Sequence, residues 1–135
     1  MRIATGFLTS AEGQAALDAA VTEAEARGAK LLVVHSQKGG ERDELEQIRA
    51  YDEAFDRATK DLDARGVDYE VKRYVRGMSP AEDLLQCAKD EDVDLLVIGI
   101  RRRSPVGKLI MGSNAQDIIL QADCPVLCVK PTGSA

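Results

Sequence analysis

Residues 94–129 decide the fold of this chain, and they read DLLVIGIRRRSPVGKLIMGSNAQDIILQADCPVLCV. The run at 94–100 is the most hydrophobic in the sequence, which is typical of a strand buried on both faces of a sheet. After a basic loop, apolar side chains recur at helical spacing over 115–122, and the run at 125–129 predicts a closing strand. A strand, a helix and a second strand in this order predict a parallel sheet.

The same alternation of strand and helix patterns extends back to the N-terminus. The run at 30–36 is continuously apolar, whereas 68–75 alternates, as expected at a sheet edge with one face buried and the other partly wet. Ser10 and the capping box Ser79-Pro80-Ala81-Glu82 predict helix starts, and Gly28 predicts a helix end. The predicted strands are 2–8, 30–36, 68–75, 94–100 and 125–129, and the predicted helices run from Ser10 to Gly28, over 41–65, from Ser79 onward and over 115–122.

This order predicts an α/β protein built on an open parallel sheet with helices on both faces. We expect a single domain over residues 1–135, because the sequence contains no linker, internal repeat or low-complexity segment. In open parallel sheets, ligands bind outside the carboxyl ends of the strands, at the point where the strand order reverses. The loop after Ile100 leaves such an end, so its position alone makes it the first candidate for a site.

Composition excludes several classes of function. The net charge of −5 argues against binding to nucleic acid or to an anionic membrane, and no apolar run approaches the length of a membrane span. The N-terminus lacks the pattern of a signal peptide, so we expect a cytoplasmic protein. The chain has three cysteines, an odd number, and no C-x-x-C pair. This pattern argues against a disulfide framework and against a metal site. No redox cofactor is expected.

A basic loop stands out in this acidic chain. Between Gly99 and Gln116 there is no Asp or Glu, while the loop carries four positive charges, so the rest of the chain carries −9 (−5 minus +4). Such a basic cluster is either a solvated loop or an anion-binding site. We favour the anion-binding site, because four like charges this close repel one another unless an anion or solvent lies between them. The four cations are Arg101, Arg102, Arg103 and Lys108.

Small residues at the two ends of this loop indicate a phosphate site. Glycine lets a backbone approach phosphate oxygens closely, and the start of the last helix offers free N–H groups with partial positive charge. Ser113 can donate its hydroxyl to a phosphate; alternatively, Ser113 or Asn114 caps the helix and contacts no ligand. Neither a P-loop nor a dinucleotide G-x-G-x-x-G motif is present. The candidate phosphate-site residues, besides the four cations, are Gly99, Gly107, Gly112, Ser113 and Asn114.

Residues 94–129 resemble the closing part of the universal stress protein family. Members of that family carry G-x-x-G, nine residues and then G-[ST] between the fourth strand and the last helix, and CPV opens their fifth strand. The resemblance covers the whole chain, because SAEGQAALDAA fits the first helix of the family and LLVVHS fits its second strand with the usual histidine. It implies a five-stranded parallel sheet in the order 3-2-1-4-5, a Rossmann-like fold of the adenine nucleotide alpha hydrolase type, and a dimer.

The resemblance also implies a ligand, since some members bind ATP or AMP while others do not. Gly99, Gly112 and Ser113 match the glycine-rich motif with its nine-residue spacing, but Arg102 holds the position of the second glycine. Leu8 stands where ATP-binding members often have an Asp near the adenine. Arg102 removes a close backbone approach and supplies a bidentate phosphate donor in its place. We assign the adenine side of the site to Gly6, Leu8 and Ser36.

Three functions remain open from the sequence. The first is a dimeric stress-response module that binds ATP, with Mg²⁺ accompanying it, or AMP, or another phosphorylated ligand at 99–114. The second is an interaction protein without a nucleotide, acting through its dimer and surface. The third is a slow ATP hydrolase or phosphotransferase, which ranks last because no Asp near the loop can be assigned to hold Mg²⁺ and no general base can be assigned. The lone His35 is expected to pack and to hydrogen-bond, and no catalytic residue is predicted.

The closing strand predicts how two copies associate. PVLCV at 125–129 comes last in the implied sheet order, so one of its edges has no partner within the chain. An apolar edge without a lysine or an internal proline invites pairing with another strand. A homodimer through this strand would satisfy its backbone and bury its free apolar side chains.

Overall fold

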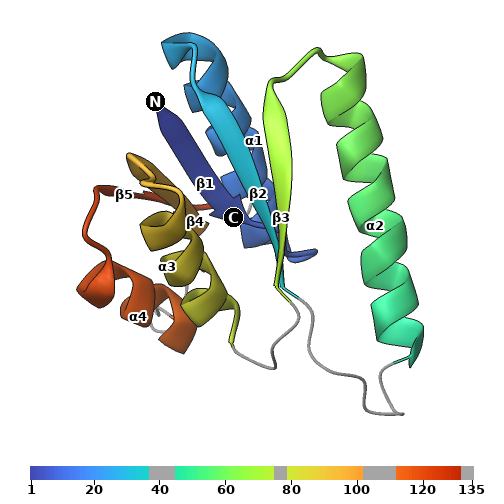
Figure 1. Cartoon of the computed structure of the whole chain (residues 1–135). Helices are drawn as coiled ribbons and strands as arrows, with labels where there is room; N and C mark the ends of the chain where they lie inside the picture. Colours follow the sequence, from blue (N-terminus) through green and yellow to red (C-terminus); the bar gives the residue numbers. More distant parts are fainter. Residues whose placement is uncertain (37–44, 75–78, 102–111, 132–135) are drawn as a thin grey trace.

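The computed structural model describes residues 1–36, 45–74, 79–101 and 112–131. All five described strands are parallel and form one sheet in the order β3-β2-β1-β4-β5, which confirms the expected α/β class and strand order (Figure 1). The strands are β1 (Arg2–Gly6), β2 (Lys30–Ser36), β3 (Tyr69–Tyr74), β4 (Leu95–Gly99) and β5 (Val126–Val129), and the helices are α1 (Ala11–Arg27), α2 (Leu45–Ala64), α3 (Pro80–Asp90) and α4 (Ser113–Gln121).

Helices cover both faces of the sheet, because successive strand side chains point to opposite faces. On one face, Ile3 and Val33 pack with the alanine-rich side of α1 and with Phe55 of α2. On the other face, Ala4 and Leu32 pack with α3 and α4, which lie side by side (Figure 1). The core is therefore two apolar layers with the sheet between them.

The reversal of strand order lies between β1 and β4. The chain leaves β1 toward α1 on one face, and after β4 it returns as α4 on the opposite face. Among the described residues, no helix passes over the carboxyl ends of these two strands, which is the position where open parallel sheets bind ligands. The loop after β4 starts at this position, as the sequence predicted.

Strand β3 lies at the edge of the sheet, as its alternating pattern predicted, but its two faces are not cleanly divided. Most of its side chains are half-buried, Arg73 is exposed, and Tyr74 is buried in the layer against α3. The predicted end of this strand at Val75 lies outside the described residues. An edge strand with helices near both faces buries parts of long polar side chains as well as apolar ones.

Local signals placed most helix ends correctly. Ser10 caps α1 by accepting a hydrogen bond from the Gly13 N–H, Gly28 ends that helix in the left-handed conformation, and Ser79 caps α3 with Pro80 at its first turn. The predicted helix over 41–65 is described from Leu45 as α2. None of the described helices is long and apolar enough to cross a membrane.

Gly99 is required by packing, not only by a ligand. A Cβ atom built on Gly99 would lie 2.0 Å from the backbone oxygen of Glu12 in the first turn of α1. The end of β4 therefore presses directly on the start of α1, and no side chain fits between them. Gly6, at the end of the neighbouring strand, differs because a Cβ there meets nothing within 4 Å.

We expect Gly99→Ala to lower the free energy of unfolding by about 1–3 kcal/mol, because the added methyl must push α1 away from the sheet. Gly6→Ala is the matched control and should change stability by less than about 1 kcal/mol. Urea denaturation of both variants measures the difference. Equal midpoints for the two variants would contradict the contact between β4 and α1.

Candidate functional site

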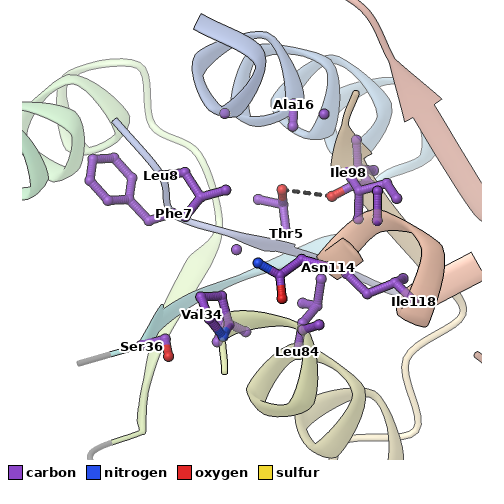
Figure 2. Close-up of a pocket in the computed structure, with 17 residues that line it drawn as sticks. Thr5, Phe7, Leu8, Ala16, Val34, Ser36, Leu84, Ile98, Asn114 and Ile118 are labelled. Carbon is purple, nitrogen blue, oxygen red and sulfur yellow. Dashed lines mark hydrogen bonds between the residues drawn. The ribbon is translucent and has the colours of Figure 1, made fainter. Parts of the chain in front are cut away.

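A pocket of about 70 Å³ opens at the carboxyl ends of β1, β2 and β4 (Figure 2). Helix α1 borders it on one side of the sheet, and the first turns of α3 and α4 border it on the other. Small-molecule sites commonly measure about 300–1,000 Å³, so this pocket would hold only one end of a larger ligand. Its apolar lining is Phe7, Leu8, Ala16, Val34, Pro80, Ala81, Leu84, Val97, Ile98, Ala115 and Ile118.

Three polar side chains line this pocket among the described residues: Thr5, Ser36 and Asn114. The Thr5 hydroxyl donates to the backbone oxygen of Val97 at 2.8 Å, which ties β1 to β4 (Figure 2). Ser36 lies at the end of β2, and Asn114 enters from the first turn of α4 (Figure 2). Polar groups thus stand at separate ends of a mainly apolar cavity.

The structure brings together much of the predicted site. The adenine-side candidates Gly6, Leu8 and Ser36 line the pocket, as do Gly99 and Asn114. Gly112 and Ser113 do not line it, but they immediately precede Asn114 at the start of α4. The predicted residues Arg102, Arg103, Gly107 and Lys108 lie outside the described residues.

The start of α4 corrects one alternative from the sequence. Neither Ser113 nor Asn114 caps the helix, because Gly112 occupies the N-cap position and no side chain accepts a hydrogen bond there. By contrast, serine hydroxyls cap both α1 and α3. Among the described residues, the first N–H groups of α4 therefore have no side-chain acceptor, and they begin beside the pocket.

Arg101 has a protein partner that its local sequence did not reveal. Its Nε lies 3.0 Å from a carboxylate oxygen of Glu12, whose side chain is only 19% exposed, while the Arg101 side chain is 74% exposed. Such an exposed pair contributes little to stability. It does hold one cation of the basic loop against α1, so repulsion within the loop is smaller than the sequence indicated.

Sequence reasoning missed the part of the pocket that α3 supplies. Pro80, Ala81 and Leu84 line the pocket from the first turns of this helix. The capping box had located the start of α3, and in a parallel α/β fold every helix that follows a strand starts near the carboxyl edge of the sheet. That topological signal was sufficient to place these residues at the site.

The lone histidine packs inside an aromatic cluster next to the pocket. His35 is 1% exposed, and its ring meets those of Tyr51 and Phe55 edge to face at 4.9 and 4.6 Å. Its two nitrogens have no hydrogen-bond partner among the described residues, and Asp52 Oδ1 lies 3.7 Å from Nε2. The expected packing is present but the expected hydrogen bond is not. Burial, reinforced by the Arg73 charge and opposed by Asp52, lowers the pKa of His35.

Tyr51 links this cluster to the pocket. Its hydroxyl donates to the backbone oxygen of Phe7 at 3.0 Å, and Phe7 lines the pocket. Burial, assisted by the neighbouring Asp52 charge, raises the pKa of Tyr51 to about 12, so the hydroxyl stays a donor at neutral pH. Helix α2 is thereby attached to the rim of the site.

Fold and pocket together define the class: an open parallel α/β protein with a pocket at its strand-order reversal. A family model described as the universal stress protein family matches residues 1–130. A universal stress protein of Mycolicibacterium smegmatis is 38% identical over 131 residues, which cover 97% of this chain and 98% of that protein. This chain belongs to the universal stress protein family.

Solved structures agree with this assignment. A universal stress protein from Archaeoglobus fulgidus superposes with a TM-score of 0.81 and 40% identity, covering 96% of this chain and 98% of that one. A structure from the same organism, in complex with dAMP, has a TM-score of 0.74 and 34% identity over 96% of this chain and 98% of that one. The chain thus shares the adenine nucleotide alpha hydrolase-like fold of these proteins.

We expect the stability of the protein to fall as pH drops below about 6.5, the ordinary pKa of histidine. In that range the unfolded chain binds a proton at His35 that the folded chain resists, so acid favours unfolding until the pH passes the lowered folded pKa. Urea denaturation between about pH 7.5 and pH 5 should show a steeper fall for the wild type than for His35→Leu. Parallel pH profiles would mean that the buried ring titrates as it does in the unfolded chain.

Proposed function

We propose that this protein is a cytoplasmic stress-response module that binds an adenine nucleotide, with the phosphate at the start of α4 and the base or sugar in the apolar pocket. The observation that carries the proposal is the helix start itself. Gly112 has no side chain to cap α4, so within the described part of the chain the first N–H groups of this helix have no side-chain acceptor, and Asn114 of the same turn lines the pocket. A phosphate bound there would accept from these N–H groups and meet the positive end of the helix dipole.

Size and charge support a ligand with few phosphates. The pocket holds only one end of a nucleotide, so the remainder would lie along the α4 start near Arg101. Glu12 already engages that arginine, which lowers the positive charge available to an incoming anion. The related Archaeoglobus fulgidus protein in complex with dAMP supports a monophosphate. ATP, accompanied by Mg²⁺, is the larger alternative ligand at the same place.

A homodimer through β5 is the second part of the proposal. Within the described residues β5 pairs only with β4, so its other edge is free. Leu127 on this strand is 37% exposed, and its neighbours Val126, Cys128 and Val129 are half-buried. Pairing with a second copy would satisfy the free backbone and cover Leu127. This surface also favours the alternative function, an interaction protein that acts through its dimer without a nucleotide.

AMP should raise the melting temperature of the wild-type protein, because a ligand that binds only the folded state stabilises it. At one hundred times Kd the gain is about 2.7 kcal/mol, and it should shrink as salt screens the phosphate. Asn114→Ala, which truncates the polar side chain in the pocket, and Gly6→Val, which places a side chain in the open space beside it, should both reduce the shift.

Gln121→Ala is the matched control for Asn114→Ala, since it truncates an exposed amide at the opposite end of α4. It should keep the full AMP shift. Melting of each variant without ligand separates lost binding from lost stability. An unchanged wild-type melting temperature with AMP and with ATP plus Mg²⁺, both in low salt, would contradict nucleotide binding and favour the interaction protein.

Light scattering should return about twice the chain mass of 14.6 kDa for the wild type. Leu127→Lys should shift the protein toward the monomer, because a lysine on the free edge opposes strand pairing. Leu120→Lys is the control: Leu120 is 81% exposed and belongs to α4, not to the strand that pairs, so the variant should remain dimeric. A monomeric wild type at micromolar concentration would exclude the β5 dimer.

A further inference from the structure

One buried carboxylate lies next to the pocket and has no part in the site described so far. Asp83 is 1% exposed in the first turns of α3, and the Ser36 hydroxyl donates to its Oδ2. Its other oxygen, Oδ1, has no hydrogen-bond partner among the described residues. Ser36 lines the pocket, and so does Leu84, which follows Asp83 in the chain. The carboxylate is therefore one hydrogen bond away from the cavity.

Asp83 decides what Ser36 can offer to the pocket. An ionised carboxylate only accepts hydrogen bonds, and a serine hydroxyl has a single hydrogen to donate. Because that hydrogen goes to Asp83, Ser36 presents only acceptor lone pairs to a ligand. Thr5 is in the same state as Ser36, since its hydrogen goes to Val97.

The two ends of the pocket therefore differ in hydrogen-bond polarity. The α4 end offers donors, namely the Asn114 amide nitrogen and the first backbone N–H groups, besides the acceptor oxygen of the same amide. The β2 end offers an acceptor, Ser36 Oγ, whose hydrogen is held by the buried Asp83 carboxylate. A ligand with a phosphate at one end and hydrogen-bond donors at the other matches both ends at once.

We propose that Asp83 is a positioning residue that fixes Ser36 as an acceptor and thereby makes the β2 end of the pocket a subsite for a hydrogen-bond donor of the ligand. In an adenine nucleotide, that donor is the exocyclic amine of the base or a hydroxyl of the ribose. This inference rests on the proposed nucleotide-binding function and assigns the orientation of the ligand within it. Leu8 leaves the end of β1 without a carboxylate, and the carboxylate of Asp83 on α3 instead bonds to Ser36 at the end of β2.

Asp83→Asn tests the assignment because it replaces an acceptor-only group with an amide of nearly the same shape. An asparagine can donate to Ser36 and so release the serine hydrogen toward the ligand. Affinities of wild type and variant for AMP, IMP and dAMP, measured by isothermal titration calorimetry, give the discrimination between ligands. IMP carries an oxo group where AMP has its amine, and dAMP lacks the 2′-hydroxyl.

The expected result is a drop of about tenfold in discrimination, the size set by one hydrogen bond in a charged network. A drop in the AMP-to-IMP ratio places the amine at Ser36, and a drop in the AMP-to-dAMP ratio places the ribose hydroxyl there; either supports the subsite. Ser36→Ala should lose the same discrimination while keeping the buried carboxylate. It serves as the second variant if Asp83→Asn folds poorly.

Asp90→Asn is the matched control, because it makes the same chemical change at an exposed position of α3. It should keep the wild-type ratios. If Asp83→Asn and Ser36→Ala alter all three affinities equally or not at all, Asp83 only fastens β2 to α3, and the subsite is overturned while nucleotide binding stands. A wild type that binds none of the three ligands overturns both.

Discussion

The contact between the end of β4 and the first turn of α1 is the constraint on which the site depends. Gly99 lets the sheet approach the Glu12 backbone with no side chain between them. This close approach brings the start of α1 beside the point where the strand order reverses. The same turn carries Glu12, which holds Arg101, so one packing contact sets both the wall of the pocket and the first charge of the loop.

Most of the fold could be predicted from the sequence because its signals are local. Apolar runs, the Ser10 and Ser79 caps and the helix end at Gly28 each act over a few residues, and the structure contains the elements that they predict. The start of α4 was harder, because Gly112 and the two polar residues after it can all occupy an N-cap position. In the structure Gly112 takes this position, and no local pattern distinguishes it from the other two.

The site was predictable only in part, for a related reason. Its glycines and its place at the carboxyl edge follow from motif and topology, but Asp83 looks in the sequence like an ordinary acidic residue in the first turn of a helix. Its burial depends on β2 lying against α3, and the Glu12–Arg101 pair likewise joins distant parts of the chain. Interactions of this kind become visible only once the elements are assembled.

Helix α2 packs against one face of the sheet, and this affects how easily the helix detaches from it. Its buried anchors, Phe55 and Leu62, belong to one apolar layer, and among the described side chains none from α2 belongs to the layer beneath α3 and α4. The helix can therefore detach as a unit while most of the sheet keeps its cover, so its amide hydrogens should exchange with solvent earlier than those of β1. Each such opening breaks the Tyr51 bond to Phe7 and exposes His35, which couples hydration of the histidine to the shape of the pocket rim.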